Sequence, residues 1–256
     1  AGIAKAKFEI IEGMASDGQL FYDGDEPLLR ELVAKRPDLQ AVSFGFEQQN
    51  DLLASAIETN ENGSSFTVEG KLNGEYFISV LGKHQVKNTL NAMLISQALG
   101  LTEEQIRTAL RQVVLTDMRM QQLPGINGSL FINDAYNAAP TSMTAAIEFM
   151  KQTSMRSRKW LVLGDMLELG EDEQQFHEQI ADVIDEQMIE KVLLYGPRMK
   201  WLYDRLVQRF EPVNLVHVVD SYEPLIEVIA TADANTVVLF KGSRGMRLEK
   251  IISALK

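Results

Sequence analysis

The sequence predicts an α/β protein, because apolar segments of strand length alternate with helix-like segments over its second half. The alternation starts near residue 129 and runs to the end of the 256-residue chain. Upstream, as far as about residue 81, short β-like segments are separated by turn signals such as Asp-Gly and Asn-Gly. We therefore expect a first region of short strands and helices, then a domain on a mainly parallel sheet.

The first region opens with a predicted helix over residues 1–12, which carries Lys5 and Lys7. Short strands are expected at 19–22, 41–44, 53–57, 65–68 and 75–80. Further helices are expected at 26–35, 85–99 and 103–113. Thr102, followed by two glutamates, provides the start signal of the last of these helices.

The second region contains five predicted strands with helices of ten to eighteen residues between them. The strands are expected near 129–133, 159–163, 191–195, 215–219 and 236–240. One helix has an apolar stripe that includes Phe176 and Ile180, and the acidic residues 171–173 at its start suit the positive end of a helix dipole. A connection over about 114–128, with Pro124 and Gly125 in it, is predicted to separate domains 1–115 and 116–256.

Composition excludes several classes of partner. With 25 basic and 36 acidic residues the formal charge is -11, which disfavours a general binder of nucleic acid or of anionic membranes. No apolar run has the length of a membrane span, and the first residues do not resemble a signal peptide. The chain has no cysteine, which agrees with a cytoplasmic protein, and we expect a monomer.

Polar side chains follow three of the predicted strands at the point where each strand ends. Residues 134–143 follow the first strand, 164–170 the second and 241–245 the last. Open α/β sheets bind ligands at the carboxyl ends of their strands. The sequence therefore predicts that these three strand ends share one pocket.

Together with residues 82–88, which read Gly-Lys-His-Gln-Val-Lys-Asn, these three segments resemble the Mur ligases, the ATP-dependent amide-bond-forming enzymes of peptidoglycan precursor synthesis. Four motifs in the family's order cover nearly the whole chain. The resemblance implies part of a central ATPase domain, followed by a Rossmann-like carboxy-terminal domain. It also implies ATP and Mg²⁺ as cofactors, with UDP-N-acetylmuramoyl tripeptide and D-alanyl-D-alanine as substrates.

The phosphate-cradling P-loop is not found in this sequence. Gly82-Lys83 has Phe77 where the loop needs a glycine, and His84 where it needs a serine or threonine. The family carries its P-loop upstream of a segment that resembles residues 4–10. We therefore expect a carboxy-terminal portion of a ligase that lacks the P-loop and the UDP-binding domain, and that is inactive alone.

Lys7 and Arg119 are the residues to which the resemblance assigns catalytic roles. The family carries a lysine at the position of Lys7 whose carbamate, formed with carbon dioxide, helps hold Mg²⁺. The alternative is that Lys5 and Lys7 form only the solvated face of a helix. Arg119 corresponds to an arginine that reaches the ATP phosphates, which guanidinium groups bind through paired hydrogen bonds.

The resemblance also implies a nucleotide site. His84 and Asn88 lie four residues apart on one helix face and would border the adenine. Asp134 would accept hydrogen bonds from a ribose hydroxyl, with Tyr136 and Asn137 bracketing the nucleotide or the acceptor. This sequence departs from the family pattern in having Gln85 and Ala139 where asparagine is usual.

The acceptor side of the cleft would hold a dipeptide zwitterion, which needs an anion for its amine and cations or hydroxyls for its carboxylate. The residues expected there are Asp165, Glu168, Lys241, Ser243 and Arg244. The alternatives are that Asp165 caps a helix and that Lys241 lies on the surface. No motif surrounds His177 or His217, and we interpret both as ordinary structural residues.

Three functions remain open from the sequence. The first is the D-alanyl-D-alanine-adding ligase, in which an acyl phosphate forms from ATP and is attacked by the dipeptide amine. The second is another Mur ligase or a folylpolyglutamate-type ligase, against which the segment 164–170 argues. The third is a non-catalytic α/β nucleotide-binding module, which the missing P-loop permits.

Overall fold

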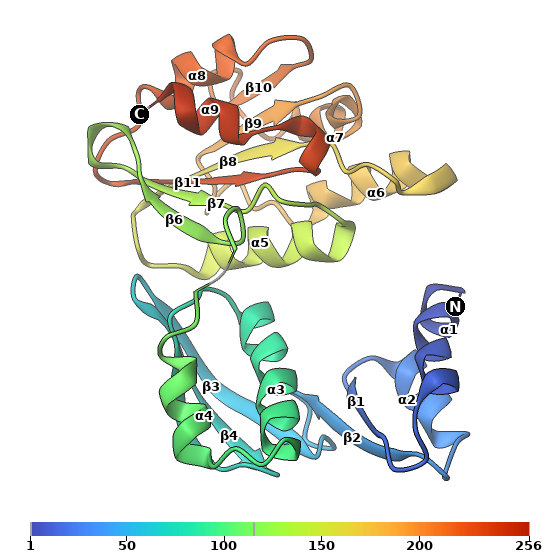
Figure 1. Cartoon of the computed structure of the whole chain (residues 1–256). Coiled ribbons are helices and arrows are strands. Elements are labelled where there is room, and N and C mark those ends of the chain that lie inside the picture. The colour runs from blue at the N-terminus through green and yellow to red at the C-terminus, as the bar shows by residue number, and fades with distance from the viewer. Residues whose placement is uncertain (1, 115, 256) are drawn as a thin grey trace. The chain divides into compact units, whose positions relative to one another are not determined.

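The computed structural model describes residues 2–114 and 116–255 (Figure 1). The chain divides into two compact units, Ala1–Val114 and Leu115–Lys256. Leu115, at the predicted boundary, lies outside the described residues. Each unit has its own sheet and is described by itself.

The first unit is built on a five-stranded sheet that is half parallel and half antiparallel. Its strands, in spatial order, are β1 (Gln19–Asp23), β2 (Gln40–Gly45), β3 (Leu52–Asn60), β4 (Gly63–Gly70) and β5 (Gly74–Ile78). β1, β2 and β3 pair in parallel, whereas β3, β4 and β5 form an antiparallel meander. All five strands predicted for this region are present.

Helices of the first unit follow the predicted order: α1 (Gly2–Phe8), the 3₁₀ helix η1 (Glu9–Gly13), α2 (Pro27–Ala34), α3 (Lys83–Ala98) and α4 (Glu103–Leu110). α3 packs on the sheet through Val86, Leu90, Met93 and Leu94, which recur at helical spacing. α4 begins with a capping box, in which Thr102 and Gln105 satisfy each other's backbone N–H groups.

The second unit has a six-stranded sheet in the order β10-β9-β8-β11-β7-β6. Its strands are β6 (Gln121–Pro124), β7 (Leu130–Asn133), β8 (Arg158–Gly164), β9 (Lys191–Tyr195), β10 (Leu215–Val218) and β11 (Thr236–Lys241). All pairs are parallel except β6 with β7. The five predicted strands are present, and β6 is an additional edge strand within the segment expected to be a connection.

The helices of the second unit form two layers. Its helices are α5 (Pro140–Gln152), α6 (Glu173–Gln179), α7 (Met199–Leu206), α8 (Glu223–Ile229) and α9 (Glu249–Ala254), with short 3₁₀ helices η2 (Ile126–Gly128), η3 (Gly170–Asp172), η4 (Ile180–Asp182) and η5 (Arg244–Met246). α8 and α9 bury their apolar side chains against Trp160, Val238 and Phe240 on one face of the sheet. α5 lies on the opposite side (Figure 1).

The predicted helix lengths are wrong for α6, α7 and α8, which have seven, eight and seven residues. The apolar stripe that includes Phe176 and Ile180 continues from α6 into η4, so that one periodic pattern covers two elements. Periodicity predicts which side chains face the core and does not predict where an α-helix ends, because a 3₁₀ turn can continue the same apolar face.

The arrangement of β7, β8 and β11 positions the site. β11 lies between the other two, with Lys241 paired to Leu163 of β8 and Phe240 paired to Asn133 of β7. The three carboxyl ends therefore lie side by side. After β11 the chain turns to α9 on one face, whereas β7 leads to α5 on the other. Ligands of open α/β sheets bind where neighbouring strands diverge in this way.

Candidate functional site

The centre of the candidate site is a buried ion pair between β11 and the end of β7. Lys241 Nζ lies 2.6 Å from Asp134 Oδ2, and the two residues are 2% and 7% exposed. The ammonium also donates to the Asn137 carbonyl at 3.2 Å, and the second carboxylate oxygen, Oδ1, accepts from the Met120 N–H at 3.1 Å. The pair therefore ties the 134–137 segment and the β6 entry to β11.

This ion pair corrects one expectation and qualifies another. The alternative that Lys241 is a surface residue is wrong, because its side chain is buried. The family resemblance implies a ribose contact for Asp134 and an acceptor contact for Lys241; the structure joins the two side chains directly, and both roles stay predictions. A buried ammonium that donates to a carboxylate fixes the position of that carboxylate, and each charge compensates the burial of the other.

Arg119 and Tyr136 form an exposed pair at the end of β7. The guanidinium carbon lies 4.3 Å from the centroid of the Tyr136 ring, which is 45% exposed. Met118 and Met120 on either side of Arg119 adopt left-handed φ values of 62° and 48°, which non-glycine residues rarely do. The Tyr136 N–H donates to the Met118 carbonyl at 3.2 Å. The strained segment thus presents Arg119 at the surface, against the Tyr136 ring.

Asp165 is fully buried and faces the start of α7. Its Oδ1 accepts from the Met199 N–H at 2.9 Å and its Oδ2 from the Arg198 N–H at 3.3 Å, while Arg198 Nη1 lies 3.8 Å from Oδ2. Burial raises the pKa of Asp165, although these contacts oppose the shift. The structure therefore supports the alternative role of Asp165 as a cap of α7, and its contact with the acceptor stays a prediction.

The turn that follows Asp165 is held by two further elements. The Leu167 N–H donates to Ser243 Oγ at 2.8 Å, so the buried Ser243 joins this turn to the end of β11. The Met166 N–H donates to Nε2 of His177 at 3.0 Å, and His177 is fully buried. Burial lowers the pKa of His177. Glu168, the next residue, is exposed and has a left-handed φ of 63°.

Arg244 is exposed on the turn after β11. Its Nη1 lies 2.7 Å from Glu249 Oε1 and 3.6 Å from the Met118 sulfur, so it lies on the same end of the sheet as Arg119. The predicted residues of the second unit consequently fall into two sets. Buried Asp134, Asp165, Lys241 and Ser243 brace the strand ends, and exposed Arg119, Tyr136, Asn137, Glu168 and Arg244 are accessible to a ligand.

In the first unit, His84 and Asn88 lie on the first turns of α3. His84 is half-buried, whereas Asn88 is exposed and donates to the Gln85 side chain at 3.2 Å. Gln85, which departs from the family pattern, therefore contacts a predicted nucleotide residue. Whether these groups hold a nucleotide stays a prediction.

Lys87, which the sequence analysis did not single out, ties α3 to the carboxyl end of β1. Its Nζ lies 3.0 Å from Asp23 Oδ2 and 2.8 Å from Asp25 Oδ2. Burial alone would raise the pKa of Asp25, but hydrogen bonds from Lys87 and from the Phe46 and Glu47 N–H groups lower it. No sequence signal marked Lys87, because its partners are about 60 residues away and a lone lysine is usually solvated.

Lys7 lies on α1 and its side chain is exposed. Within residues 2–114 and 116–255, no group of three or more histidine, cysteine or acidic side chains comes together as a metal site. A carbamate on Lys7 would add one oxygen ligand of the kind that Mg²⁺ prefers.

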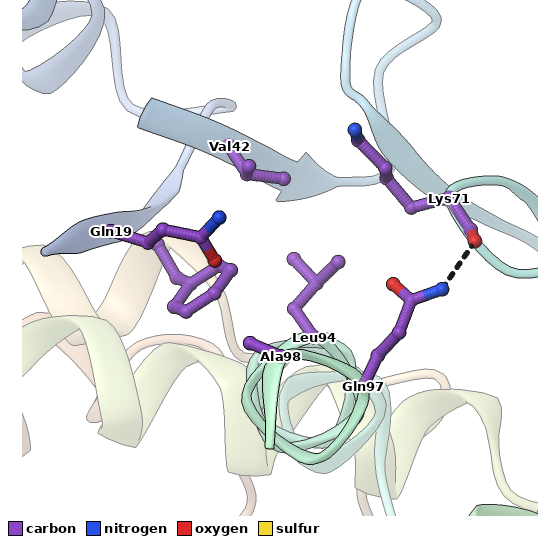
Figure 2. A pocket seen from close by; sticks show the side chains of 7 residues that line it. Gln19, Val42, Lys71, Leu94, Gln97 and Ala98 are labelled. Atoms are coloured by element: carbon purple, nitrogen blue, oxygen red, sulfur yellow. Dashed lines mark hydrogen bonds between the residues drawn. The ribbon is translucent and has the colours of Figure 1, made fainter. Parts of the chain in front are cut away.

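A small pocket of the first unit lies between α3 and the strands β1 and β2 (Figure 2). It is lined by Gln19, Phe21, Val42, Lys71, Leu94, Gln97 and Ala98. The Gln97 amide crosses its rim to donate to the Lys71 carbonyl at 3.0 Å. None of the predicted site residues lines it, so it is separate from the candidate nucleotide residues on the first turns of α3.

Comparison with known proteins defines the class to which these domains belong. The Mur ligase middle domain family matches residues 1–96, and the family described as Mur ligase, glutamate ligase domain matches residues 118–244. The first match lies within the first structural unit and the second match within the second unit. The chain belongs to the Mur ligase family.

The chain is also similar in sequence to individual enzymes of this family. The chain is 37% identical to the UDP-N-acetylmuramoyl-tripeptide–D-alanyl-D-alanine ligase of Bacillus subtilis, over 99% of this chain and 54% of the relative. The Escherichia coli ligase of the same name is 25% identical, over 100% and 55%. The chain spans about half the length of the curated relatives it matches.

Solved structures give the same result. MurF of Acinetobacter baumannii superposes with a TM-score of 0.85 and 26% identity, over 99% of this chain and 55% of that chain. The MurF ligase of Thermotoga maritima in complex with ADP superposes with a TM-score of 0.84, over 99% and 56%, and its 22% identity bears on the fold alone. In the described part of this chain, no helix is long and apolar enough to cross a membrane.

Proposed function

We propose that this chain supplies nucleotide-binding and acceptor-binding parts of a ligase that joins D-alanyl-D-alanine to UDP-N-acetylmuramoyl tripeptide at the expense of ATP. The observation that carries the proposal is the 37% identity, over 99% of this chain, to a ligase named for that reaction. Residues 1–115 would contribute to the central ATP-binding domain and 116–256 would form the acceptor-binding domain. We expect the enzyme to act as a cytoplasmic monomer.

The reaction begins when the terminal carboxylate of the tripeptide attacks the γ-phosphorus of ATP, which releases ADP and forms an acyl phosphate. The unprotonated amine of the dipeptide then attacks the acyl carbon, and phosphate leaves from the tetrahedral intermediate. Negative charge grows on phosphoryl oxygens in the first step and on the acyl oxygen in the second. Cationic groups that are already in place stabilise such charge.

Arg119 supports the nucleotide half of this proposal. Its guanidinium is exposed at a strand end and is held on the Tyr136 ring, so it is positioned before a ligand arrives. Guanidinium binds phosphate oxygens through parallel hydrogen bonds. The buried pair of Asp134 and Lys241 fixes the 134–137 segment on which Tyr136 stands. A protein of the same fold has been solved with ADP.

Glu168 and Arg244 support the acceptor half. A dipeptide carries an ammonium group at one end and a carboxylate at the other. Glu168 offers an exposed carboxylate and Arg244 an exposed guanidinium, and Ser243 joins the two turns that carry them. In the proposal, Glu168 accepts hydrogen bonds from the ammonium and Arg244 donates to the carboxylate. Mg²⁺, when bound, would offset phosphate charge, with the Lys7 carbamate as one candidate ligand.

The test is an acceptor screen on this protein extended to the length of its relatives, called here the extended ligase. Phosphate release would be measured with ATP, Mg²⁺ and UDP-N-acetylmuramoyl tripeptide, while the acceptor is varied among D-alanyl-D-alanine, single amino acids and glutamate with a folate. The proposal expects turnover that depends on the dipeptide. Preference for another acceptor would identify a different ligase, and no turnover with any acceptor would favour a binding module.

A further inference from the structure

Three consecutive residues after β8 are anchored by three different elements. The Asp165 carboxylate accepts backbone N–H groups of Arg198 and Met199 at the start of α7. The Met166 N–H donates to a side chain of α6, and the Leu167 N–H donates to a side chain that follows β11. These contacts restrict the backbone conformation of the three residues that precede Glu168.

The anchor from α6 is His177, whose ring is held in one protonation state by its two partners. The Met166 N–H can only donate, so Nε2 must be the unprotonated nitrogen that accepts at 3.0 Å. The proton is therefore on Nδ1, which donates to the Glu173 carbonyl at 2.7 Å. The Trp201 ring packs edge-on against the imidazole at 5.7 Å between centroids. A neutral histidine satisfies both contacts, whereas an imidazolium satisfies only one.

We propose that His177 is a positioning residue that holds the Asp165–Glu168 turn in the conformation that presents the Glu168 carboxylate to the acceptor. The proposal rests on the proposed function, because it uses Glu168 as the group that receives the dipeptide ammonium. Glu168 has a left-handed φ of 63°, a conformation that costs a glutamate free energy and persists only when its surroundings impose it. The Met166 anchor lies two residues from that strained position.

The charged groups around the ring indicate how pH acts on this anchor. Asp165 from the end of β8, Glu173 from α6 and Arg198 from the start of α7 all interact with His177. Arg198 is itself paired with Glu173 at 2.6 Å. Burial lowers the pKa of His177 and keeps the ring neutral at neutral pH. Protonation would place a hydrogen on Nε2, opposite the Met166 N–H, and would release the turn.

The first experiment measures hydrogen exchange at the Met166 and Leu167 amides in this 256-residue chain. His177→Leu removes the acceptor, His177→Gln places an amide oxygen within reach of Met166, and Ile229→Val perturbs the core on the opposite face of the sheet. We expect exchange at Met166 to rise at least about tenfold in His177→Leu and to stay near wild type in the other two. Equal protection in His177→Leu and Ile229→Val would overturn the proposal.

A measurement on the unmodified chain covers the case in which His177→Leu fails to fold. The ¹⁵N shifts of the His177 ring report which nitrogen carries the proton, and the three histidines are assigned by single substitution. We expect the Nδ1–H tautomer at neutral pH, with the Met166 amide shift changing only when the ring titrates in acid. A ring that is protonated at Nε2 at neutral pH would overturn the proposal.

The second experiment separates this inference from the proposed function by using the extended ligase. His177→Leu should raise the KM for D-alanyl-D-alanine at least about fivefold while the KM for ATP stays within about twofold, and His177→Gln should restore the dipeptide KM. If His177→Leu only destabilised the fold, the concentration of active enzyme would fall, but the KM for the dipeptide would not rise relative to the KM for ATP. An unchanged dipeptide KM in His177→Leu would contradict the positioning role. An unchanged dipeptide KM in Glu168→Gln would contradict only the proposed use of Glu168.

Discussion

Asp134 and Lys241, which are 107 residues apart in the sequence, meet in a buried ion pair at the carboxyl ends of β7 and β11. The carboxylate also accepts from the Met120 N–H and the ammonium donates to the Asn137 carbonyl, so the pair joins the ends of β7 and β11 to the segment before β6. Two charges that are removed from water are stable only while both are present. The pair therefore makes the fold of the second unit depend on two residues of the site.

The first prediction follows from this dependence. Lys241→Met or Asp134→Leu alone leaves the other charge buried and unpaired, which costs about 3–5 kcal/mol in buried ion pairs. The double variant removes both charges and should recover most of that loss. The free energy of unfolding in urea, followed by tryptophan fluorescence from Trp160 and Trp201, measures all three. If each single variant lost less unfolding free energy than the double variant, the interaction between Asp134 and Lys241 would not be what stabilises the fold.

A second prediction concerns the amino-terminal end of the same sheet. Arg158 donates twice to Glu190 at 2.9 Å and once to Asp233 at 2.8 Å, and the Trp160 Nε1–H also donates to Glu190. The hydrogen bonds from Arg158 lower the pKa of Glu190. Its stabilising effect is therefore complete above the unfolded pKa of about 4.3 and is lost as pH falls through the lower, folded value.

Glu190→Gln should accordingly reduce stability by about 1–2 kcal/mol at pH 7, less than a fully buried charged hydrogen bond contributes, because both side chains are about a third exposed. The difference from wild type should shrink below about pH 4. Urea unfolding at a series of pH values is the measurement. A difference that stays constant down to acid pH would show that the charge on Glu190 is not responsible.

The third prediction uses the buried His177. Burial lowers its pKa in the folded state, so the unfolded chain binds the proton more readily. Stability is then highest above the unfolded pKa of about 6.5 and decreases as pH falls from there toward the folded value. His177→Gln does not titrate and should flatten the stability curve in that window. An identical pH dependence in variant and wild type would assign the acid sensitivity to other groups.

The fourth prediction concerns Arg119. Arg119→Lys keeps the charge but loses the planar fork that binds phosphate and stacks on Tyr136. In the extended ligase we expect the affinity for ADP to fall about tenfold with little change in stability, because Arg119 is exposed. Isothermal titration calorimetry with ADP and Mg²⁺ measures the affinity for ADP. Exposed Arg205→Lys is the matched control, and equal losses in both variants would show that the effect is not specific to Arg119.

The fifth prediction is that the 256-residue chain alone does not turn over ATP. Its sequence contains no P-loop pattern, and that loop supplies the backbone amides and the lysine that hold the β- and γ-phosphates. A phosphate-release assay with ATP, Mg²⁺ and both substrates measures this directly, beside the extended ligase as a positive control. Acceptor-dependent turnover by the chain alone would show that its own residues suffice for phosphoryl transfer.

Sequence periodicity predicted most of the fold because each strand and helix leaves a local pattern. The ten strands expected from apolar runs are all present, in the order proposed. β6 was missed because it has only four residues, ends in Pro124 and pairs along one edge, so its sequence has the signals of a turn. The predicted helix that contains α6 is longer than α6 itself, because η4 continues the apolar face of α6 without continuing its α-helical hydrogen bonds.

The site was predictable as a set of strand ends and not as a set of contacts. The polar segments after β7, β8 and β11 do lie side by side, as their positions at strand ends implied. Burial then divides them in a way that no local pattern records: Asp165 and Lys241 turn inward to partners from distant segments, whereas Glu168 and Arg244 remain exposed. No local pattern marks His177, because its contact with Met166 depends on how α6 packs.

The central claim is that the turns after β8 and β11 bind the dipeptide acceptor, and one measurement tests it most directly. It is the KM for D-alanyl-D-alanine of the extended ligase carrying Arg244→Ala, measured beside its KM for ATP. The account predicts that the dipeptide KM rises about tenfold or more while the ATP KM stays within about twofold, because in the proposed function Arg244 would donate to the dipeptide carboxylate and not to ATP. An unchanged dipeptide KM, or an equal rise in both constants, would contradict it.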